Sequence, residues 1–292
     1  SIVQMPAGIP VGTLAIGRIG APVATPYDLL SAVKDPAPEL RRMAAFALGE
    51  IDDIKAAPLL ASMLDDPDPQ ARALAAEALG KLKDPASLAS LTRLLGDPAA
   101  EVIGMTLRSL WKIDASDRLP DLAARAAGIY IGGFGDLKRD AAYFLMRAQM
   151  GRPEEESVEP ALIAVAKDED PLARSYAARG LGARKSPSAT QALLALAADP
   201  DWRVRVNAFN GLRTRPGART GDAGSRWKTY EAGVNDKDTG VTLAAMAALE
   251  SLDAPQARER LVKTLAHTRA RFREVAAMAL AAREKGPALP LL

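Results

Sequence analysis

Apolar residues recur along the chain with a period that predicts paired helices. The segment APELRRMAAFALGEI from Ala37 aligns with DPQARALAAEALGKL from Asp68 and AAEVIGMTLRSLWKI from Ala99, which gives a period of about 31 residues. The same frame continues to the end of the chain and gives eight copies. Within a copy the apolar positions are four residues apart, as on one face of an α-helix. One column is leucine in every copy: Leu48, Leu79, Leu110, Leu145, Leu181, Leu212, Leu249 and Leu280.

A second column lies four residues before the leucine and holds small side chains. It is alanine in all copies but one, where Thr106 takes its place. Small residues let a neighbouring helix approach closely. Shorter apolar segments between the long ones, such as PLLASMLDD from Pro58, predict partner helices with their own apolar stripe. The pattern therefore predicts an all-α fold, an α-α superhelical solenoid of about eight two-helix repeats.

The residues between the predicted helices are typical of turns. Proline disfavours helix in the residue before it and suits the first turn of a helix, and aspartate can cap exposed amides. Asp-Pro is thus predicted to end one helix and begin the next. Glycines near the ends of long helices are predicted to be left-handed C-caps at Gly49, Gly80 and Gly182. The Asp-Pro pairs are Asp35-Pro36, Asp66-Pro67, Asp97-Pro98, Asp170-Pro171 and Asp199-Pro200.

A cation follows the first apolar column in most copies. Ile103 and Thr242 interrupt the series. A cation that repeats once per layer can reach the turn carboxylate of an adjacent repeat, which predicts a structural ladder. The other interpretation is a row of ligand-binding arginines. The members are Arg41, Arg72, Lys138, Arg174, Arg205 and Arg273.

These features together resemble the HEAT-like repeats of bacterial proteins, a group that also includes phycobilin lyase repeats. The resemblance rests on the Asp-Pro turn, the Leu/Val-Arg step and endings such as AAFALGEI and AAEALGKL, and it covers residues 18–292. It implies a superhelix with the long, second helix of each pair on the concave side. It is specific for the fold and does not assign a function.

The period is stretched at three places. The step along the invariant leucine column is longer from Leu110 to Leu145, from Leu145 to Leu181 and from Leu212 to Leu249 than it is elsewhere. The first insertion, residues 126–136, is glycine-rich, but no strand precedes it and no GK[ST] follows, so a flexible bend is expected rather than a phosphate loop. The second, residues 151–160, predicts an acidic loop and a helix start. The third spans residues 213–230.

The third insertion combines cations with aromatic residues, which could form a nucleic-acid or phosphate patch. The other interpretation is a solvated loop in which Trp227 and Tyr230 pack the next short helix. The net charge of +2 argues against a protein built to hold nucleic acid. The candidate residues of this basic loop are Arg213, Arg215, Arg219, Arg226, Trp227 and Lys228.

Outward positions of the long helices are candidates for binding a protein partner across the concave groove. Tyrosine, tryptophan and arginine dominate the energetics of protein interfaces. Scattered aromatic residues could instead fill gaps where the period stretches. The candidates are Arg108, Trp111, Arg139, Tyr143, Arg179 and Arg203.

Residues 1–17 do not fit the repeat, because Gly8, Pro10 and Gly12 would lie inside a helix. The wording QMPAGIPVGTLAIG resembles a C-terminal fragment of the aminoimidazole ribonucleotide carboxylase/mutase family. That resemblance ends between Gly17 and Ala21 and lacks the family's catalytic segments, so it implies no catalytic residue and no such activity here. We interpret the segment as the trace of a fusion or chimeric reading frame joined near Gly17, with both ends of the array truncated.

Composition removes many classes of enzyme. The chain has no cysteine and one histidine, His267, so thiolate chemistry, disulfides and multi-histidine metal sites are excluded. His267 lies between two repeats and is interpreted as a turn residue, as are Asp65, Asp66 and Asp68. No apolar run approaches the roughly 18 residues of a membrane span. We therefore expect no catalytic residue, no metal and no cofactor.

The function that this pattern favours is a non-catalytic scaffold that binds an unidentified protein partner on its concave face. One alternative is an accessory or regulatory region of a larger enzyme. That enzyme could be a phycobilin lyase-like assembly, or an array fused to a catalytic domain such as a peptidyl-prolyl isomerase. The second alternative is nucleic-acid binding through the basic loop.

Overall fold

The computed structural model describes residues 29, 31–113, 119–133, 135–151, 158–214 and 223–284. Helices and turns make up all of this described part, which contains no strand. The chain divides into two compact units, Ser1–Ile113 and Asp114–Leu292. None of the described helices is long and apolar enough to cross a membrane.

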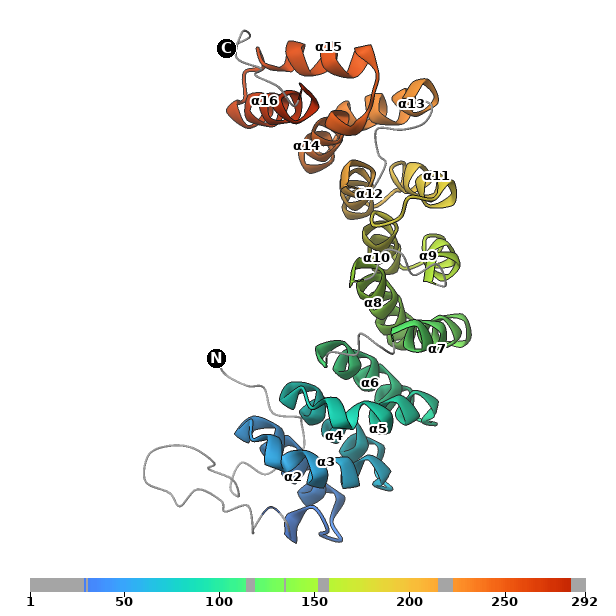
Figure 1. Ribbon diagram of the computed structural model, residues 1–292, viewed down its shortest axis with the longest axis vertical. Helices are drawn as coiled ribbons and strands as arrows, with labels where there is room; N and C mark the ends of the chain where they lie inside the picture. Colours follow the sequence, from blue (N-terminus) through green and yellow to red (C-terminus); the bar gives the residue numbers. More distant parts are fainter. Residues whose placement is uncertain are drawn as a thin grey trace, which may run out of the picture. The chain divides into compact units, whose positions relative to one another are not determined.

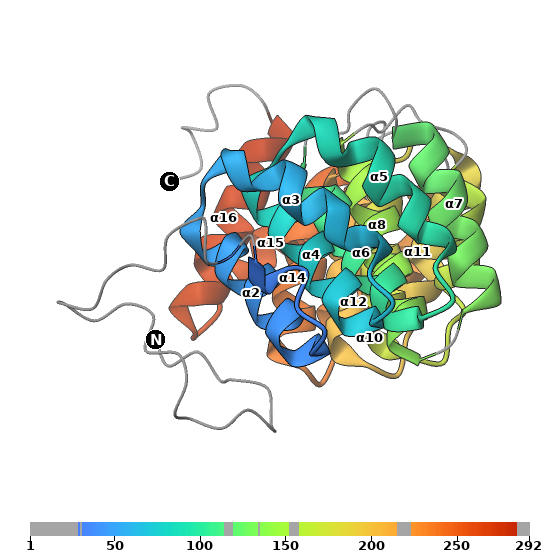
Figure 2. The ribbon, with the colours of Figure 1, turned by 90° about the horizontal axis from the view of Figure 1, so that it is seen from below.

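In the first unit, long helices alternate with short ones that are flanked by 3-10 turns. The short helices α3 and α5 lie on one side of α2, α4 and α6, as Figures 1 and 2 show. Each apolar segment predicted to be a partner helix is therefore helical. The helices are α2 (Pro38–Ile51), α3 (Ala57–Ser62), α4 (Pro69–Leu82), α5 (Leu88–Arg93) and α6 (Ala100–Lys112).

The second unit is a stack of helix pairs. Along its inner, concave side run α8 (Gly135–Gly151), α10 (Pro171–Leu181), α12 (Trp202–Thr214), α14 (Thr239–Ala248) and α16 (Ala270–Glu284). Along the other side run α7 (Leu119–Gly132), α9 (Glu159–Val165), α11 (Pro187–Leu196), α13 (Ala223–Val234) and α15 (Pro255–Thr264). Figure 1 shows both rows, and within this unit it places the second helix of each pair on the concave side, as the family resemblance implies.

The predicted apolar columns form the core of both units. All eight leucines of the invariant column are buried, and Leu280 is the most exposed of them at 7%. The small column is buried as well, including Thr106, whose hydroxyl donates to the carbonyl of Val102 at 2.7 Å. The small side chains thus let successive long helices pack closely, as their spacing indicates.

The prediction of left-handed C-cap glycines is wrong. Gly49 and Gly80 lie inside α2 and α4, and Gly182 has a right-handed helical backbone. A Cβ on Gly49 would lie 2.7 Å from the Cβ of Ala78 in the next layer, so this glycine is required for close packing between helices. The left-handed C-caps are instead Asp52 and Lys83, with φ of 55° and 54°.

The Asp-Pro pairs lie at the helix boundaries as predicted, but only Pro171 is in the first turn of its helix. At the other four pairs the helix begins two residues after the proline. Asp66 lies between a 3-10 turn and α4, and its Oδ1 accepts a hydrogen bond from the Asp68 N–H at 2.8 Å. Asp68 then caps α4 by accepting from the Ala71 N–H at 2.9 Å. In other layers Asp97, Asp168 and Asp199 accept the same backbone hydrogen bond, so each turn begins its helix at a fixed register.

The insertions differ in how far they interrupt the helices. In the first, α7 continues to Gly132 and α8 begins at Gly135, so most of the expected bend is helix. Gly135 has φ of +54°, a conformation that favours glycine. In the second, α9 begins at Glu159, which confirms the predicted helix start. Residues 152–157 and 215–222 lie outside the described residues, as does nearly all of residues 1–30.

Candidate functional site

The repeated cations form the predicted ladder along the turns. The guanidinium of Arg72 donates from Nε and Nη2 to both carboxylate oxygens of Asp97, at 2.8 Å each. Its Nη1 donates to the carbonyls of Asp66 and Pro67, at 2.8 and 3.2 Å. One side chain therefore ties its own turn to the turn of the next layer. The same rung is made by Arg41 with Asp66, Arg174 with Asp199 and Arg205 with Asp236.

These rungs are largely shielded from solvent, and the arginine stabilises the charged form of carboxylates such as Asp66 and Asp97. Burial of Asp66 opposes its ionisation, but the Arg41 guanidinium and the Asp68 N–H outweigh burial and hold the pKa of this carboxyl below its usual value. The same balance, with Arg72 as the cation, lowers the pKa of Asp97. Every guanidinium nitrogen of such a rung has a partner, so the ladder is a structural device rather than a ligand site.

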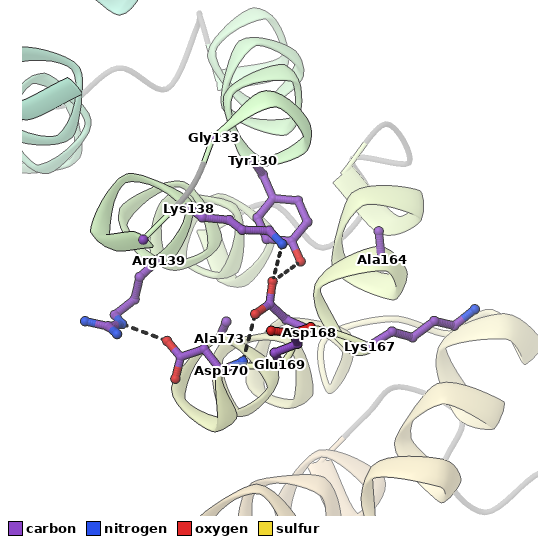
Figure 3. A pocket seen from close by; sticks show the side chains of 11 residues that line it. Tyr130, Gly133, Lys138, Arg139, Ala164, Lys167, Asp168, Glu169, Asp170 and Ala173 are labelled. Atoms are coloured by element: carbon purple, nitrogen blue, oxygen red, sulfur yellow. Dashed lines mark hydrogen bonds and ion pairs between the residues drawn. The ribbon is translucent and has the colours of Figure 1, made fainter. Parts of the chain in front are cut away.

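One rung is built differently. Lys138 takes the place of arginine, and its Nζ lies 2.8 Å from Asp168 Oδ2. The hydroxyl of Tyr130, on α7, donates to the same oxygen at 2.7 Å, and the lysine nitrogen lies 4.9 Å from the centre of the tyrosine ring. A lysine has one donor nitrogen where arginine has three, so the tyrosine supplies the second donor. Figure 3 shows both groups directed at Asp168.

A cavity of about 550 Å³ adjoins this rung. It lies between the α7–α8 turn at Gly133 and Gly135 and the α9–α10 turn at Lys167 to Asp170 (Figure 3). Burial, together with the hydrogen bond to Asp168, raises the pKa of Tyr130. Asp168 is held below its usual pKa because Lys138, Tyr130 and a backbone N–H outweigh its burial. The polar groups of this rung are thus already engaged with one another.

The structure brings three of the candidate partner-binding residues together on α8 and α10. Tyr143 and Arg139 lie on α8, one helical turn apart, and the exposed Arg179 lies on the neighbouring α10. The Tyr143 ring packs edge-on against Tyr176, with 5.3 Å between centroids and 71° between planes. Arg139 Nε lies 2.7 Å from Asp170 Oδ2, which raises the pKa of the guanidinium.

Two exposed apolar residues lie at the starts of α10 and α12, and neither was predicted from the sequence. Leu172, in the first turn of α10, is 41% exposed, and Trp202, at the start of α12, is 50% exposed. The candidate Arg203 lies beside Trp202 and pairs with Asp201 at 2.7 Å, which lowers the pKa of that carboxyl to about 2. Tyr176 was not predicted either. Trp202 occupies the first-turn position that is proline, Pro171, in α10. A large aromatic residue in place of this proline is the sequence feature that could have indicated an exposed binding residue.

The remaining candidates of this set lie in the first unit. Arg108 and Trp111 are on α6. Arg108 is exposed, and its Nη2 is 3.9 Å from the sulfur of Met105, whereas Trp111 is half-buried.

The described part of the basic loop is mostly turned toward the protein. Arg226 is buried, and Arg213 Nη1 lies 3.4 Å from Glu250 Oε1. Tyr230 is fully buried and packs edge-on against Phe209 of the preceding helix α12, with 5.9 Å between ring centroids. Trp227 is half-buried and Lys228 is exposed. Arg215 and Arg219 lie outside the described residues.

His267 is a turn residue, as predicted. Its Nδ1 accepts a hydrogen bond from the Arg269 N–H at 3.1 Å, and its ring stacks on Phe272 at 4.4 Å. Within the described ranges, no three acidic or histidine side chains are grouped as metal ligands would be.

Known proteins share this architecture. A model of HEAT repeats matches residues 25–111 and 159–223, which is more than half of the chain. The crystal structure of YibA from Escherichia coli is similar, with a TM-score of 0.66 and 16% identity over 89% of this chain and 93% of YibA. An engineered protein is similar with a TM-score of 0.63 and 19% identity, over 89% of this chain and 78% of its own. No curated protein sequence matches. The chain belongs to the HEAT-repeat family.

Proposed function

We propose that this protein is a non-catalytic scaffold that binds a protein partner on the inner surface of α8, α10 and α12. A HEAT-repeat solenoid is compatible with such a role, because stacked repeats present an extended concave surface. The partner is a protein segment long enough to cross the three helices.

The observation that carries the proposal is that Tyr143 packs against Tyr176 and that Arg179, Leu172 and Trp202 are exposed on the same and the adjacent helix. Tyrosine, tryptophan and arginine are the residues that contribute most binding energy at protein interfaces. Half of the Trp202 side chain is exposed, and Leu172 is nearly as open, although neither exposure is needed for the repeat. In the closed rungs, by contrast, such as that of Arg72, every guanidinium nitrogen is already engaged within the protein.

The proposal is tested by using the chain as bait, identifying the retained proteins by mass spectrometry at two salt concentrations, and measuring the affinity of each purified candidate. Tyr176→Ala and Arg179→Glu should each weaken a true partner by roughly tenfold or more, as for residues central to an interface. Lys263→Glu is the matched control, because Lys263 is an exposed cation on α15, in the other row of helices. A partner whose affinity is equal for all variants would contradict the proposal.

Two other functions stay as predictions. Nucleic-acid binding through the basic loop is disfavoured by the burial of Arg226 and the pairing of Arg213 with Glu250. It would show as retained nucleic acid that is lost steeply with salt. A role as an accessory region of a larger enzyme includes a phycobilin lyase-like one, which would show as a change in visible absorbance on mixing with a bilin.

A further inference from the structure

The exposed side of α10 is a single row of three side chains. Leu172 and Arg179 are the two exposed residues of this helix, and the half-buried Tyr176 lies between them. Residues four and seven positions apart lie on one face of a helix, so the three side chains form a row along its axis. The row changes from apolar through aromatic to cationic in the direction of the chain.

The leucine at the start of this row takes a position that is acidic in other layers. The same position in the repeat holds Glu39 in α2, Glu101 in α6 and Asp136 in α8. An acidic residue in the first turn stabilises a helix through its dipole, whereas a leucine there does not. Because Leu172 is 41% exposed, it also contributes little to the core, and it is available for contact with another molecule.

The arginine at the other end of the row is not held by an acidic side chain. On α8, Arg139 pairs with Asp170 at 2.7 Å. On α12, Arg203 pairs with Asp201, also at 2.7 Å. Among the residues that the structure describes, the guanidinium of the exposed Arg179 has no ion pair and no hydrogen bond. Its charge and its donor nitrogens are therefore available to a ligand.

The tyrosines beside Arg179 add two further donors. Tyr176 packs edge-on against Tyr143, and within the described ranges neither hydroxyl has a hydrogen-bond partner. Burial raises the pKa of Tyr176, while the positive charges of Arg139 and Arg179 lower it in part, so both guanidinium groups lie close to this hydroxyl. Asp140 also acts on the hydroxyl, but it is half-buried. Guanidinium and hydroxyl donors that surround one place suit a carboxylate, which only accepts hydrogen bonds.

We propose that the protein partner places an acidic side chain on Arg179 and an apolar side chain on Leu172, so that the docking segment is acidic and apolar. This inference rests on the proposed function, because it names the chemistry of a partner for the same surface. Seven residues of helix separate the two contacts by about 10 Å. In an extended partner segment this distance corresponds to roughly three residues.

The neighbouring α12 extends the apolar end of the row. Asn207 Nδ2 donates to Ser175 Oγ at 2.6 Å near the middle of both helices, and the glycines that follow or lie near their C-terminal ends are in contact. The two helices therefore run side by side in the same direction. Trp202, in the first turn of α12 and 50% exposed, lies at the end of the row where Leu172 is.

The charge of this surface disfavours two other kinds of partner. A basic segment would bring like charge to Arg179. Nucleic acid is held by several cations on its phosphates, and the neighbouring Arg139 and Arg203 are already paired. The surface is therefore complementary to a protein segment that carries a carboxylate.

The test is a selection of peptides from a random library displayed on phage, with the whole chain as the target. The selected peptides should carry Asp or Glu roughly three residues from an aliphatic or aromatic residue. Their synthetic copies should bind Arg179→Glu roughly tenfold or more weakly, as when one partner of an interface charge pair is removed. Lys263→Glu is the matched control and should bind them with unchanged affinity, because Lys263 is exposed on α15 in the other row of helices. A selection on Arg179→Glu should instead enrich Lys or Arg at the acidic position.

The outcomes separate the acidic partner from the proposed function itself. Peptides that need Tyr176 and Leu172 but bind Arg179→Gln with full affinity would overturn the acidic partner and leave the inner surface as a binding site. Binding that survives substitution of all three residues, or a selection that yields no binding peptide, would contradict both proposals. Circular dichroism of each variant checks that a loss of affinity is not a loss of folding.

Discussion

The ladder and the inner surface of α8–α12 use the same residue types in opposite ways. Along the ladder, arginine recurs at one position of the repeat and engages the same aspartate and the same two carbonyls in layer after layer. On the inner surface the side chains change from layer to layer: Tyr143 on α8, Arg179 on α10 and Asn210 on α12 occupy one position. Regular residues hold the layers together, whereas the irregular ones are available to recognise a partner.

The exposed arginines of this surface are of two kinds, which differ in whether an aspartate of a nearby turn holds the side chain. Arg203 and Arg139 are on the surface, but each is held by an aspartate in an adjoining turn. Arg179 is exposed on α10, one helical turn from Tyr176. We therefore expect ladder changes to act on folding and inner-surface changes to act on binding.

The largest effect on folding is expected from breaking a regular rung. Arg174→Ala removes the bidentate contact to Asp199 and the donors to two carbonyls, in a pair whose side chains are 14% and 6% exposed. The free energy of unfolding should fall by about 2–3 kcal/mol, measured by urea denaturation. Arg93→Ala is the control, because its pair with Asp65 is 58% and 64% exposed and should contribute less than about 1 kcal/mol. Equal losses for the two variants would contradict the structural role of the ladder.

Acid should weaken the ladder as a whole. The pKa values of Asp66, Asp97 and Asp236 are held below their usual range because arginine and backbone N–H groups outweigh burial. Their contribution is therefore full above the unfolded-state pKa, about 4, and is lost as the pH falls through the folded-state values. The melting temperature should be constant near neutral pH and should fall below about pH 4. Asp66→Asn should flatten this slope, and a melting temperature that rises on acidification would refute the account.

The modified rung provides an intermediate effect. Tyr130 is 4% exposed, and Tyr130→Phe removes one of the two side-chain donors to Asp168. The free energy of unfolding should fall by about 1–2 kcal/mol. Tyr143→Phe, at a half-buried ring in the adjacent helix, should change it by no more than about 0.5 kcal/mol. If the two substitutions had the same effect, the hydroxyl of Tyr130 would not be a working part of the ladder.

The smallest effect is expected from restoring the regular residue. Lys138→Arg places two donors within reach of Asp168, and its larger head occupies part of the adjoining cavity. Stability should rise by less than about 1 kcal/mol. The cost of Tyr130→Phe should also shrink in this background, because the arginine makes the tyrosine hydroxyl redundant, and a double-mutant cycle measures that coupling. A coupling of zero would show that the two donors act independently.

Much of the fold could be predicted from the sequence because its determinants recur. The leucine column, the turn aspartates and the ladder recur along the repeat, and the structure confirms the buried leucines, the turns and the rungs. The role of Gly49 could not be predicted, because the sequence does not distinguish a glycine at a helix end from one that Ala78 of the next layer approaches. A glycine in either role would lie at the same distance from the invariant leucine in the sequence.

The candidate site was harder to predict because its residues do not recur. Tyr176 and Leu172 are single occurrences, and their meaning depends on which layer is adjacent. The bond from Tyr130 to Asp168 joins two elements across a stretched repeat, so no period reveals it. Arg108 and Arg179 share one position in the repeat, yet the structure places them in different units.

On this account, the inner surface binds the partner and the ladder stabilises the fold. It is tested most directly by measuring, in the same variants, the affinity for a captured partner and the free energy of unfolding. Arg179→Glu should lower the affinity roughly tenfold or more and leave unfolding within about 0.5 kcal/mol of the unmodified chain. Arg174→Lys should lower stability and leave the affinity of the folded protein unchanged. Loss of affinity in Arg174→Lys, with full affinity in Arg179→Glu, would contradict the account.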